Sequence, residues 1–547
     1  MPETDTTAKR RPPLLPLLLF AALLAGAGLW LAWTGTEVFW PGLLMTLVLY
    51  FVVCWIGWRA GRGRDMRNAD EMMLAGRMLP LGMAVCTMSA TWLGGGYING
   101  TAEYVYRSDY GLVWTQAPWG YALSLAVGGL FFAGRMRRMG YHTMLDPLEQ
   151  RYGRMLTAAL FLPALTGEVF WSAAILTALG ATFGVILNVD MSTAIILSAV
   201  IAIAYTMLGG LWAVAATDTL QVFLIFLGLG VVAVFAVPQA GGLVDMFEGY
   251  RASMGAQGRF FPPLAGWGED GLGKWYWQWW DCMLLLVFGG IAWQVYFQRV
   301  LAAKTPAVAR NLSLVAAVVC VAAALLATLL GMAGNQMDWA ALGVERLDNA
   351  GGGLILPYVI RYCSPRLVAM LGLAAIATAV MSSVDSSVLS AASMATWNVY
   401  RPLFARDLSS RHMAKVIRRC IVLVGVAALL LALRVQSVYA LWFLCSDFVY
   451  CILFPQLVCA LYDRKANRIG AAAGLAVSAV LRFGAGEAAL GIPRLLPWPM
   501  VEDGVVLFPY RTTAMLCGLA AILVVSRLTQ RIAPPTPLQP MHLDEPA

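Results

Sequence analysis

Residues 90–101 read ATWLGGGYINGT and fall in an apolar span that begins near residue 79. Three consecutive glycines, Gly94 to Gly96, are unfavourable in a helix that must satisfy every backbone group internally in hydrocarbon. The sequence therefore predicts a helix that is deliberately interrupted and exposes backbone carbonyls at membrane depth. A second interruption is expected five helices later at Gly289-Gly290-Ile291-Ala292-Trp293. The alternative is that these glycines only let helices pack closely.

Composition places the whole chain in the membrane. Of its 547 residues 60% are hydrophobic and only 12% are charged, whereas a soluble domain carries about 25% charge. The mean hydropathy is +0.71. Disordered, disulfide-framed and cytosolic classes are excluded, and an all-α polytopic membrane protein is expected.

Hydropathy divides the chain into about fourteen transmembrane helices. They are expected near residues 14–33, 38–58, 79–99, 109–134, 155–185, 191–210, 213–237, 277–300, 310–334, 367–394, 416–434, 438–461, 468–486 and 510–527. The first could instead be a secretory signal peptide, but its length and its basic start favour a retained helix. The tail from Pro534 is short and proline-rich, and disorder is expected there.

Basic residues lie in short loops that all fall on one side under this count, which the positive-inside rule assigns to the cytoplasm. These loops are Arg135 to Arg138, Arg299 to Lys304, Arg401 to Arg419 and Arg464 to Arg468. The net charge of +8 therefore reflects topology and indicates no nucleic-acid partner. The ten cysteines contain no CxxC pair, and the three histidines form no metal-spaced cluster, so neither a disulfide frame nor metalloprotease chemistry is expected.

The span 367–394 carries the run AVMSSVDSS at residues 379–387. Ala379, Ser382, Ser383 and Ser386 share one helical face, which lines it with oxygen atoms of the kind that sodium prefers. Tight packing with back-bonded hydroxyls is the alternative. The embedded Asp385 favours a functional site. Glu168, Asp218, Asp281 and Asp447 are further acids at membrane depth, which either contact ions or simply pair and cap.

Aromatic residues form a third signal. Trp92 and Trp293 lie beside the two predicted breaks, and Tyr121, Trp171 and Trp442 lie within other spans. A site walled by ring faces favours a quaternary ammonium, which has no hydrogen-bond donors. Ordinary core packing is the alternative. Paired broken helices at mid-membrane are typical of secondary transporters, in which freed carbonyls coordinate sodium.

Several runs resemble the sodium/solute symporter family over roughly residues 40 to 530. They are TWLGGGYINGTAEYVY (91–106), MLDPLEQRYG (144–153), AYTMLGGLWAVAATDTLQVF (204–223), GGIAWQVYFQRVL (289–301) and AVMSSVDSSVLSAASM (379–394). GGLWAVAATDTLQ is similar to a family-wide signature, and the GGGYINGTAE run resembles the choline branch.

The resemblance implies an inverted five-plus-five helix core with broken first helices and extra peripheral helices. The expected divisions are a cytoplasmic tail (1–12), two peripheral helices (13–60), a first repeat (79–237), an extracellular loop (238–276), a second repeat (277–461), two peripheral helices (462–530) and a short tail (531–547).

The resemblance also assigns site residues. It implies an aromatic cage for the substrate ammonium at Trp92, Tyr121, Trp171, Trp293 and Trp442. One sodium ion would take the carbonyls of Ala90, Leu93 and Ala379 with the hydroxyls of Ser382 and Ser383, and a second would lie near Asp385 and Ser386. Chloride dependence is expected, without a placed site.

The expected function is sodium-driven choline import by alternating access, in a plasma (inner) membrane protein that spans the lipid bilayer many times. Homodimer formation is left open. The rivals are a symporter for another solute, such as a betaine or an amino acid, and a transporter-like sensor. A zwitterion would want a cationic partner in the cage, and none is present among the cage positions. Enzyme activity is not expected, because the buried acids lie on different helices without a histidine partner.

Overall fold

The computed structural model describes residues 37–61, 69–206, 211–262, 272–404, 410–487 and 490–541, with scattered residues between 22 and 35. The expected first helix near 14–33 lies mostly outside these described residues. Among them, ten helices are long and apolar enough to cross a membrane, and two shorter apolar helices accompany them. The chain is thus a multi-pass membrane protein, while the count of about fourteen spans stays a prediction.

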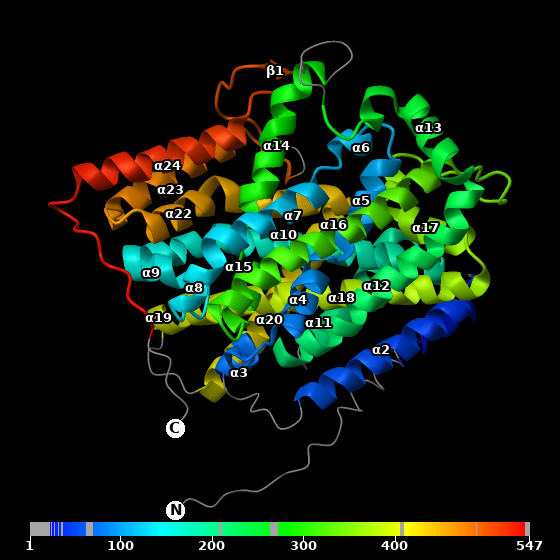
Figure 1. Cartoon of the computed structure of the whole chain (residues 1–547), viewed down its shortest axis with the longest axis horizontal. Coiled ribbons are helices and arrows are strands. Elements are labelled where there is room, and N and C mark those ends of the chain that lie inside the picture. Colours follow the sequence, from blue (N-terminus) through cyan, green and yellow to red (C-terminus); the bar gives the residue numbers. More distant parts are fainter. Residues whose placement is uncertain are drawn as a thin grey trace, which may run out of the picture.

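Helices form almost the whole described fold (Figure 1). In the first half they are α2 (Trp40–Gly61), α3 (Ala69–Leu74), α4 (Leu81–Trp92), α5 (Gly95–Tyr106), α6 (Gly111–Trp114), α7 (Ala117–Val127), α8 (Gly134–Arg138), α9 (Asp146–Tyr152), α10 (Arg154–Leu187), α11 (Met191–Thr206), α12 (Leu211–Gln239) and α13 (Gly242–Met254). A π-helical turn, Gly128–Ala133, joins α7 to α8.

The second half contains α14 (Tyr276–Gly289), α15 (Gln294–Ala302), α16 (Pro306–Gln336), α17 (Ile355–Tyr362), α18 (Arg366–Met394), α19 (Arg401–Phe404), α20 (Ser410–Val435), α21 (Val438–Phe448), α22 (Phe454–Tyr462), α23 (Arg468–Gly484) and α24 (Tyr510–Leu528). Further π-helical turns lie at Ala395–Tyr400 and Val449–Leu453. Strands β1 (Val501–Glu502) and β2 (Val505–Val506) pair antiparallel, with Val501 opposite Val506. Asp503 and Gly504 both have positive φ, as a two-residue hairpin turn requires.

Both predicted helix interruptions are present. The first span ends as α4 at Trp92 and resumes as α5 at Gly95. The second ends as α14 at Gly289 and resumes as α15 at Gln294. Matched breaks five helices apart are the feature that an inverted repeat requires, and they place two half-helix N-termini inside the molecule.

Helices α10 and α18 form the centre of the fold. α10 packs against α18, α21, α11 and α5, and α18 packs against α12 and α2. The most apolar stretch of α10 is almost entirely buried, so it is hydrophobic around its circumference, as expected for a core helix. Figure 1 places α2 at one edge of the molecule and the pair α23–α24 toward the opposite edge. The peripheral helices thus flank the core that carries the breaks.

The C-terminal tail differs from the expectation of disorder over residues 534–541. Arg151 Nη1 donates to the Thr536 carbonyl at 2.7 Å, and Gln150 exchanges two hydrogen bonds of 3.1 Å with the Gln539 backbone. The Met541 amide donates to the Met139 carbonyl at 2.9 Å. Composition could not indicate these partners, because they lie on α9 and in the loop before it, almost 400 residues away in the sequence.

Deleting residues 534–547 should therefore raise amide deuterium uptake in the segment 139–154 that contains α9. Hydrogen bonds that hold this segment are lost, which lowers its local opening free energy. Hydrogen-exchange mass spectrometry of the detergent-solubilised protein measures the effect. The distant α13 serves as the internal control, and unchanged uptake at 139–154 would contradict the packing described.

Candidate substrate and sodium site

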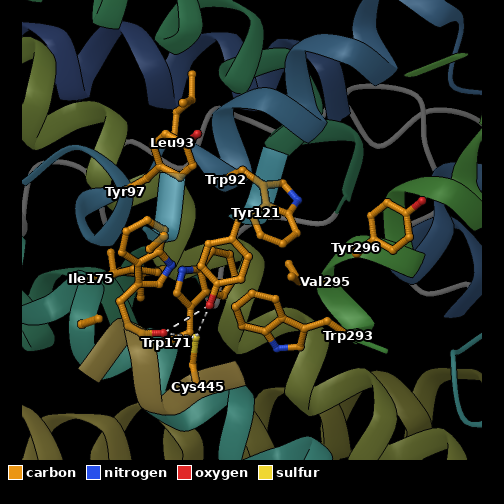
Figure 2. Close-up of a cluster of buried hydrophobic side chains, with 14 of the residues drawn as sticks. Trp92, Leu93, Tyr97, Tyr121, Trp171, Ile175, Trp293, Val295, Tyr296 and Cys445 are labelled. Atoms are coloured by element: carbon orange, nitrogen blue, oxygen red, sulfur yellow. Dashed lines mark hydrogen bonds between the residues drawn. The ribbon is translucent and has the colours of Figure 1, made fainter. Parts of the chain in front are cut away.

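Five aromatic side chains from five helical segments meet between the two breaks. Four ring contacts carry the cluster: Trp92–Tyr121 at 5.0 Å, Trp92–Trp293 at 5.5 Å, Trp171–Trp293 at 5.0 Å and Tyr121–Trp442 at 5.1 Å between centroids. Every ring is at most 3% exposed. Figure 2 shows Trp92, Tyr121, Trp171 and Trp293 converging on one another. The structure thus brings all five predicted cage residues together.

The polar atoms of these five residues lie at the edges of the rings, so the ring faces themselves are apolar. The Tyr121 hydroxyl lies 2.5 Å from Ser446 Oγ and donates to the Trp442 carbonyl at 3.3 Å, which fixes it to α21. The indole N–H groups of Trp92 and Trp293 are buried without a hydrogen-bond partner among the described residues. None of the cation–π contacts in the described part of the chain involves these five rings. Aromatic ring faces of this kind attract an organic cation.

The glycines at the first break serve close packing as well as interruption. A Cβ built on Gly94 would lie 2.6 Å from the Ser383 Cβ, and one on Gly96 would lie 3.0 Å from the Trp442 ring. Both explanations of the glycine run, helix interruption and close helix packing, therefore hold. Glycine lets the break approach the serine-bearing helix on one side and the aromatic cluster on the other.

The first predicted sodium site is assembled only in part by direct contacts. Ser383 Oγ donates to the Ala90 carbonyl at 3.3 Å and to the Thr91 carbonyl at 3.4 Å. Leu93 follows at the break, and Ala379 lies one turn earlier on α18. Hydroxyl and carbonyl oxygens of this kind suit a hard monovalent cation. Among the described residues no group of three or more His, Cys, Asp or Glu side chains could hold a metal ion.

Ser382 faces a different partner from Ser383. Its hydroxyl donates to Asp218 on α12, whose other oxygen accepts from Thr87 of α4 at 2.5 Å. The sequence singled out Asp218 as a buried acid but did not connect it with Ser382, because only the packing of α12 on α18 joins them. Thr87 was missed altogether, since one threonine in an apolar span carries no signal.

Asp385 and Ser386 also point apart, as neighbouring helical residues do. Asp385 accepts from Thr206 of α11 at 2.5 Å, whereas Ser386 accepts from Arg299 of α15 and lies 3.4 Å from Thr91 Oγ1. Assigning Arg299 to a basic cytoplasmic loop was wrong. It is 0% exposed within α15, because its guanidinium has polar partners inside the protein, Gln298 among them.

Two of the buried acids make ion pairs with arginines. Asp447 binds Arg482 at 2.5 Å and Arg511 at 2.9 Å, and Arg511 lies 3.6 Å from Asp281. These pairs join the predicted peripheral helices α23 and α24 to α21 and α14. Charged residues in a membrane interior commonly pair with one another in this way.

Comparisons with known proteins identify the family of the chain. The model of the sodium:solute symporter family matches residues 72–478. The chain is 44% identical to a high-affinity choline transporter of Caenorhabditis elegans over 509 residues, covering 90% of this chain and 86% of that protein. It is 41% identical to the human high-affinity choline transporter over 502 residues, covering 89% and 85%.

Among solved structures, a Na+-coupled sialic acid symporter matches with a TM-score of 0.72 at 19% identity, covering 92% of this chain and 99% of that one. At this identity the match supports the fold alone. Because the family transports solutes, the protein is a transporter and not an enzyme. The chain belongs to the sodium:solute symporter family and is a homologue of the high-affinity choline transporters.

Proposed function

We propose that this protein imports choline, driven by sodium, through alternating access in the plasma (inner) membrane. The observation that carries the proposal is the buried cluster of five aromatic rings beside the hydroxyl-bearing face of α18. A desolvated quaternary ammonium gains about 2 kcal/mol or more from such ring faces. The two buried indole N–H groups suit the hydroxyl oxygen of choline as an acceptor.

Sodium coupling fits the position of the first break. A sodium ion at Ala90, Leu93 and Ala379 with Ser382 and Ser383 would hold the broken helix against α18. A second ion near Asp385 and Ser386 would have to accommodate Arg299, which already donates to Ser386. A membrane potential of about 100 mV supplies roughly 2.3 kcal/mol for each positive charge moved inward, so sodium adds to the drive on a substrate that is itself a cation.

Alternating access finds support in the contacts at one end of the cluster. Glu103 accepts from Ser437 Oγ at 2.9 Å and from the Tyr439 amide at 3.2 Å. The Tyr439 ring stacks on Tyr104 with centroids 3.5 Å apart. Under the predicted topology this end faces outward, so these contacts between α5 and α21 would close the site from outside.

Tyr439→Ala should shift the protein toward the outward-open state, because it removes the stacked ring and the hydrogen bonds of its hydroxyl. If sodium favours that state, half-maximal choline binding should need about threefold to tenfold less sodium, and choline uptake should become slower. Sodium titrations of choline binding and uptake check both effects, with Tyr439→Phe as the variant that retains the ring. A sodium requirement unchanged from wild type would contradict this gate.

Chloride dependence is part of the proposal only because the resemblance to the family implies it. Replacing chloride by gluconate at constant sodium should then lower the rate of choline uptake in proteoliposomes. The same rate in both anions would remove chloride from the account.

Ligand selectivity separates the proposed substrate from its rivals. Purified protein in sodium should bind radiolabelled choline, and unlabelled choline should compete far better than glycine betaine, proline or 3,3-dimethylbutanol, the uncharged analogue of choline. Competition by betaine or proline equal to that by choline would favour a symporter for another solute. Binding of choline without accumulation in vesicles would favour a sensor.

A further inference from the structure

Glu168 makes contacts that neither the cage nor the sodium site accounts for. It lies near the middle of α10, one turn before Trp171, and is 0% exposed. Its Oε1 accepts from the Val295 amide at 3.2 Å and from Ser390 Oγ at 2.5 Å. Its Oε2 accepts from Ser387 Oγ at 3.2 Å. One carboxylate therefore joins three helices, α10, α15 and α18.

The contact with Val295 fixes one wall of the aromatic cluster. Val295 is the second residue of α15, and its amide is one of the donors that a helix N-terminus leaves without an intrahelical partner. A buried carboxylate is a favourable acceptor there. Trp293 is the extended residue that precedes this helix. Holding the first turn of α15 therefore holds the Trp293 backbone.

The same stretch of α10 approaches Trp293 directly. A Cβ on Gly167, the residue before Glu168, would lie 3.3 Å from Trp293 Nε1. Trp171, one turn beyond Glu168, contacts the Trp293 ring at 5.0 Å. Figure 2 shows Trp171, Trp293 and Val295 in the same group of side chains. Glu168 therefore lies close to Trp171 and Trp293, two of the five aromatic residues of the cage.

The other contacts of Glu168 reach the helix with the predicted sodium ligands. Ser387 and Ser390 lie one and two turns beyond Ser383 on α18. Ser387 also donates to the Glu168 carbonyl at 3.0 Å and lies 2.6 Å from Ser172 Oγ. Arg299 of α15 interacts electrostatically with Glu168, but no ion pair joins the two side chains in the described part of the chain, so the proposal rests on the hydrogen bonds of Glu168.

From these contacts we propose that Glu168 is a positioning residue that couples sodium binding to choline binding. Through its hydrogen bonds, the positions of the cage residues Trp171 and Trp293 depend on the position of α18. This inference rests on the proposed function. Sodium bound between α4 and α18 would favour one position of α18. The hydrogen bonds of Glu168 would then fix the positions of α10 and α15 relative to α18. A chain of packed and hydrogen-bonded residues between two sites can carry energetic coupling of this kind.

The test compares choline dissociation constants with and without sodium, using radiolabelled choline on purified full-length protein. Ser390→Ala removes the shorter of the two hydroxyl hydrogen bonds from α18 to the Glu168 side chain and should reduce the sodium enhancement of choline affinity by about tenfold, as expected for a buried hydrogen bond to a carboxyl group. Choline affinity without sodium should stay near the wild-type value. Ser393→Ala is the matched control, because Ser393 Oγ is buried on the same helix without a partner among the described residues.

Substitutions at Glu168 itself separate hydrogen bonding from charge. Glu168→Gln can still accept from Val295 and Ser390 and should keep most of the sodium enhancement, whereas Glu168→Ala should lose it. A purely structural defect would lower the number of binding-competent molecules and leave the ratio of the two dissociation constants unchanged.

Two outcomes would overturn the proposal. The first is a wild-type ratio in Ser390→Ala, a result that does not depend on whether Glu168→Ala folds. The second is loss of the enhancement in folded Glu168→Gln, which would assign the effect to the charge of Glu168 and not to its hydrogen bonds. If the wild-type protein itself binds choline without any sodium enhancement, the proposed function fails before this inference is reached.

Discussion

Trp293→Ala should raise the dissociation constant for choline by at least about thirtyfold, which corresponds to the loss of roughly 2 kcal/mol from one desolvated cation–π contact. Trp293 has the central place in the cluster, because its ring contacts Trp92, Tyr121 and Trp171. Its removal also takes away the ring contact of Trp171, whereas Trp92 and Tyr121 still contact each other. Equilibrium binding of radiolabelled choline in saturating sodium measures the effect.

Two variants control this prediction. Trp293→Phe keeps an aromatic face and should stay within about fivefold of wild type, since phenylalanine is a weaker cation–π partner than tryptophan. Trp397→Ala removes a tryptophan that stacks on His142, away from the cluster, and should leave choline affinity unchanged. If Trp293→Ala binds choline as well as Trp397→Ala does, the aromatic cage is not the choline site.

Ser383→Ala should raise the sodium concentration for half-maximal choline uptake by about tenfold or more, because it deletes an oxygen ligand that a buried cation cannot replace with water. The Ser383 hydroxyl donates to the Ala90 and Thr91 carbonyls at the break. A sodium ion at this position would bind oxygens of both α4 and α18. Initial rates of choline uptake across a sodium titration provide the measurement.

The control for this variant is again Ser393→Ala, which removes the same atom farther along α18. Binding of choline at saturating sodium should remain close to wild type in Ser383→Ala, which distinguishes a sodium ligand from a cage residue. A sodium dependence identical to that of Ser393→Ala would remove Ser383 from the sodium site.

The sequence predicted the features of the fold that depend on local backbone chemistry. Glycine runs at Gly94 to Gly96 and at Gly289 and Gly290 predicted both interruptions, and the structure confirms them at those positions. The five aromatic residues could be named because the resemblance to the choline branch implied an aromatic cage at these positions. Their side chains do lie together.

Other features could not be predicted, because they depend on partners that are distant in the sequence. Arg299 looked like a loop residue at the end of a span, and its burial becomes favourable because its guanidinium donates to Ser386 of α18 and to Gln298. The acids Asp281 and Asp447 looked like possible ion ligands until the structure placed Arg482 and Arg511 beside them. For the two acids the sequence indicated the correct depth in the membrane without the partner, whereas for Arg299 it indicated neither.

Sodium-driven choline import is tested by uptake of radiolabelled choline into proteoliposomes that contain the purified protein, under an inward sodium gradient. Replacing external sodium by potassium is the control. The account predicts accumulation of choline above the external concentration, dependent on sodium and absent in Trp293→Ala. Accumulation that is equal in potassium, or no accumulation by protein that binds choline, would contradict sodium-driven choline import.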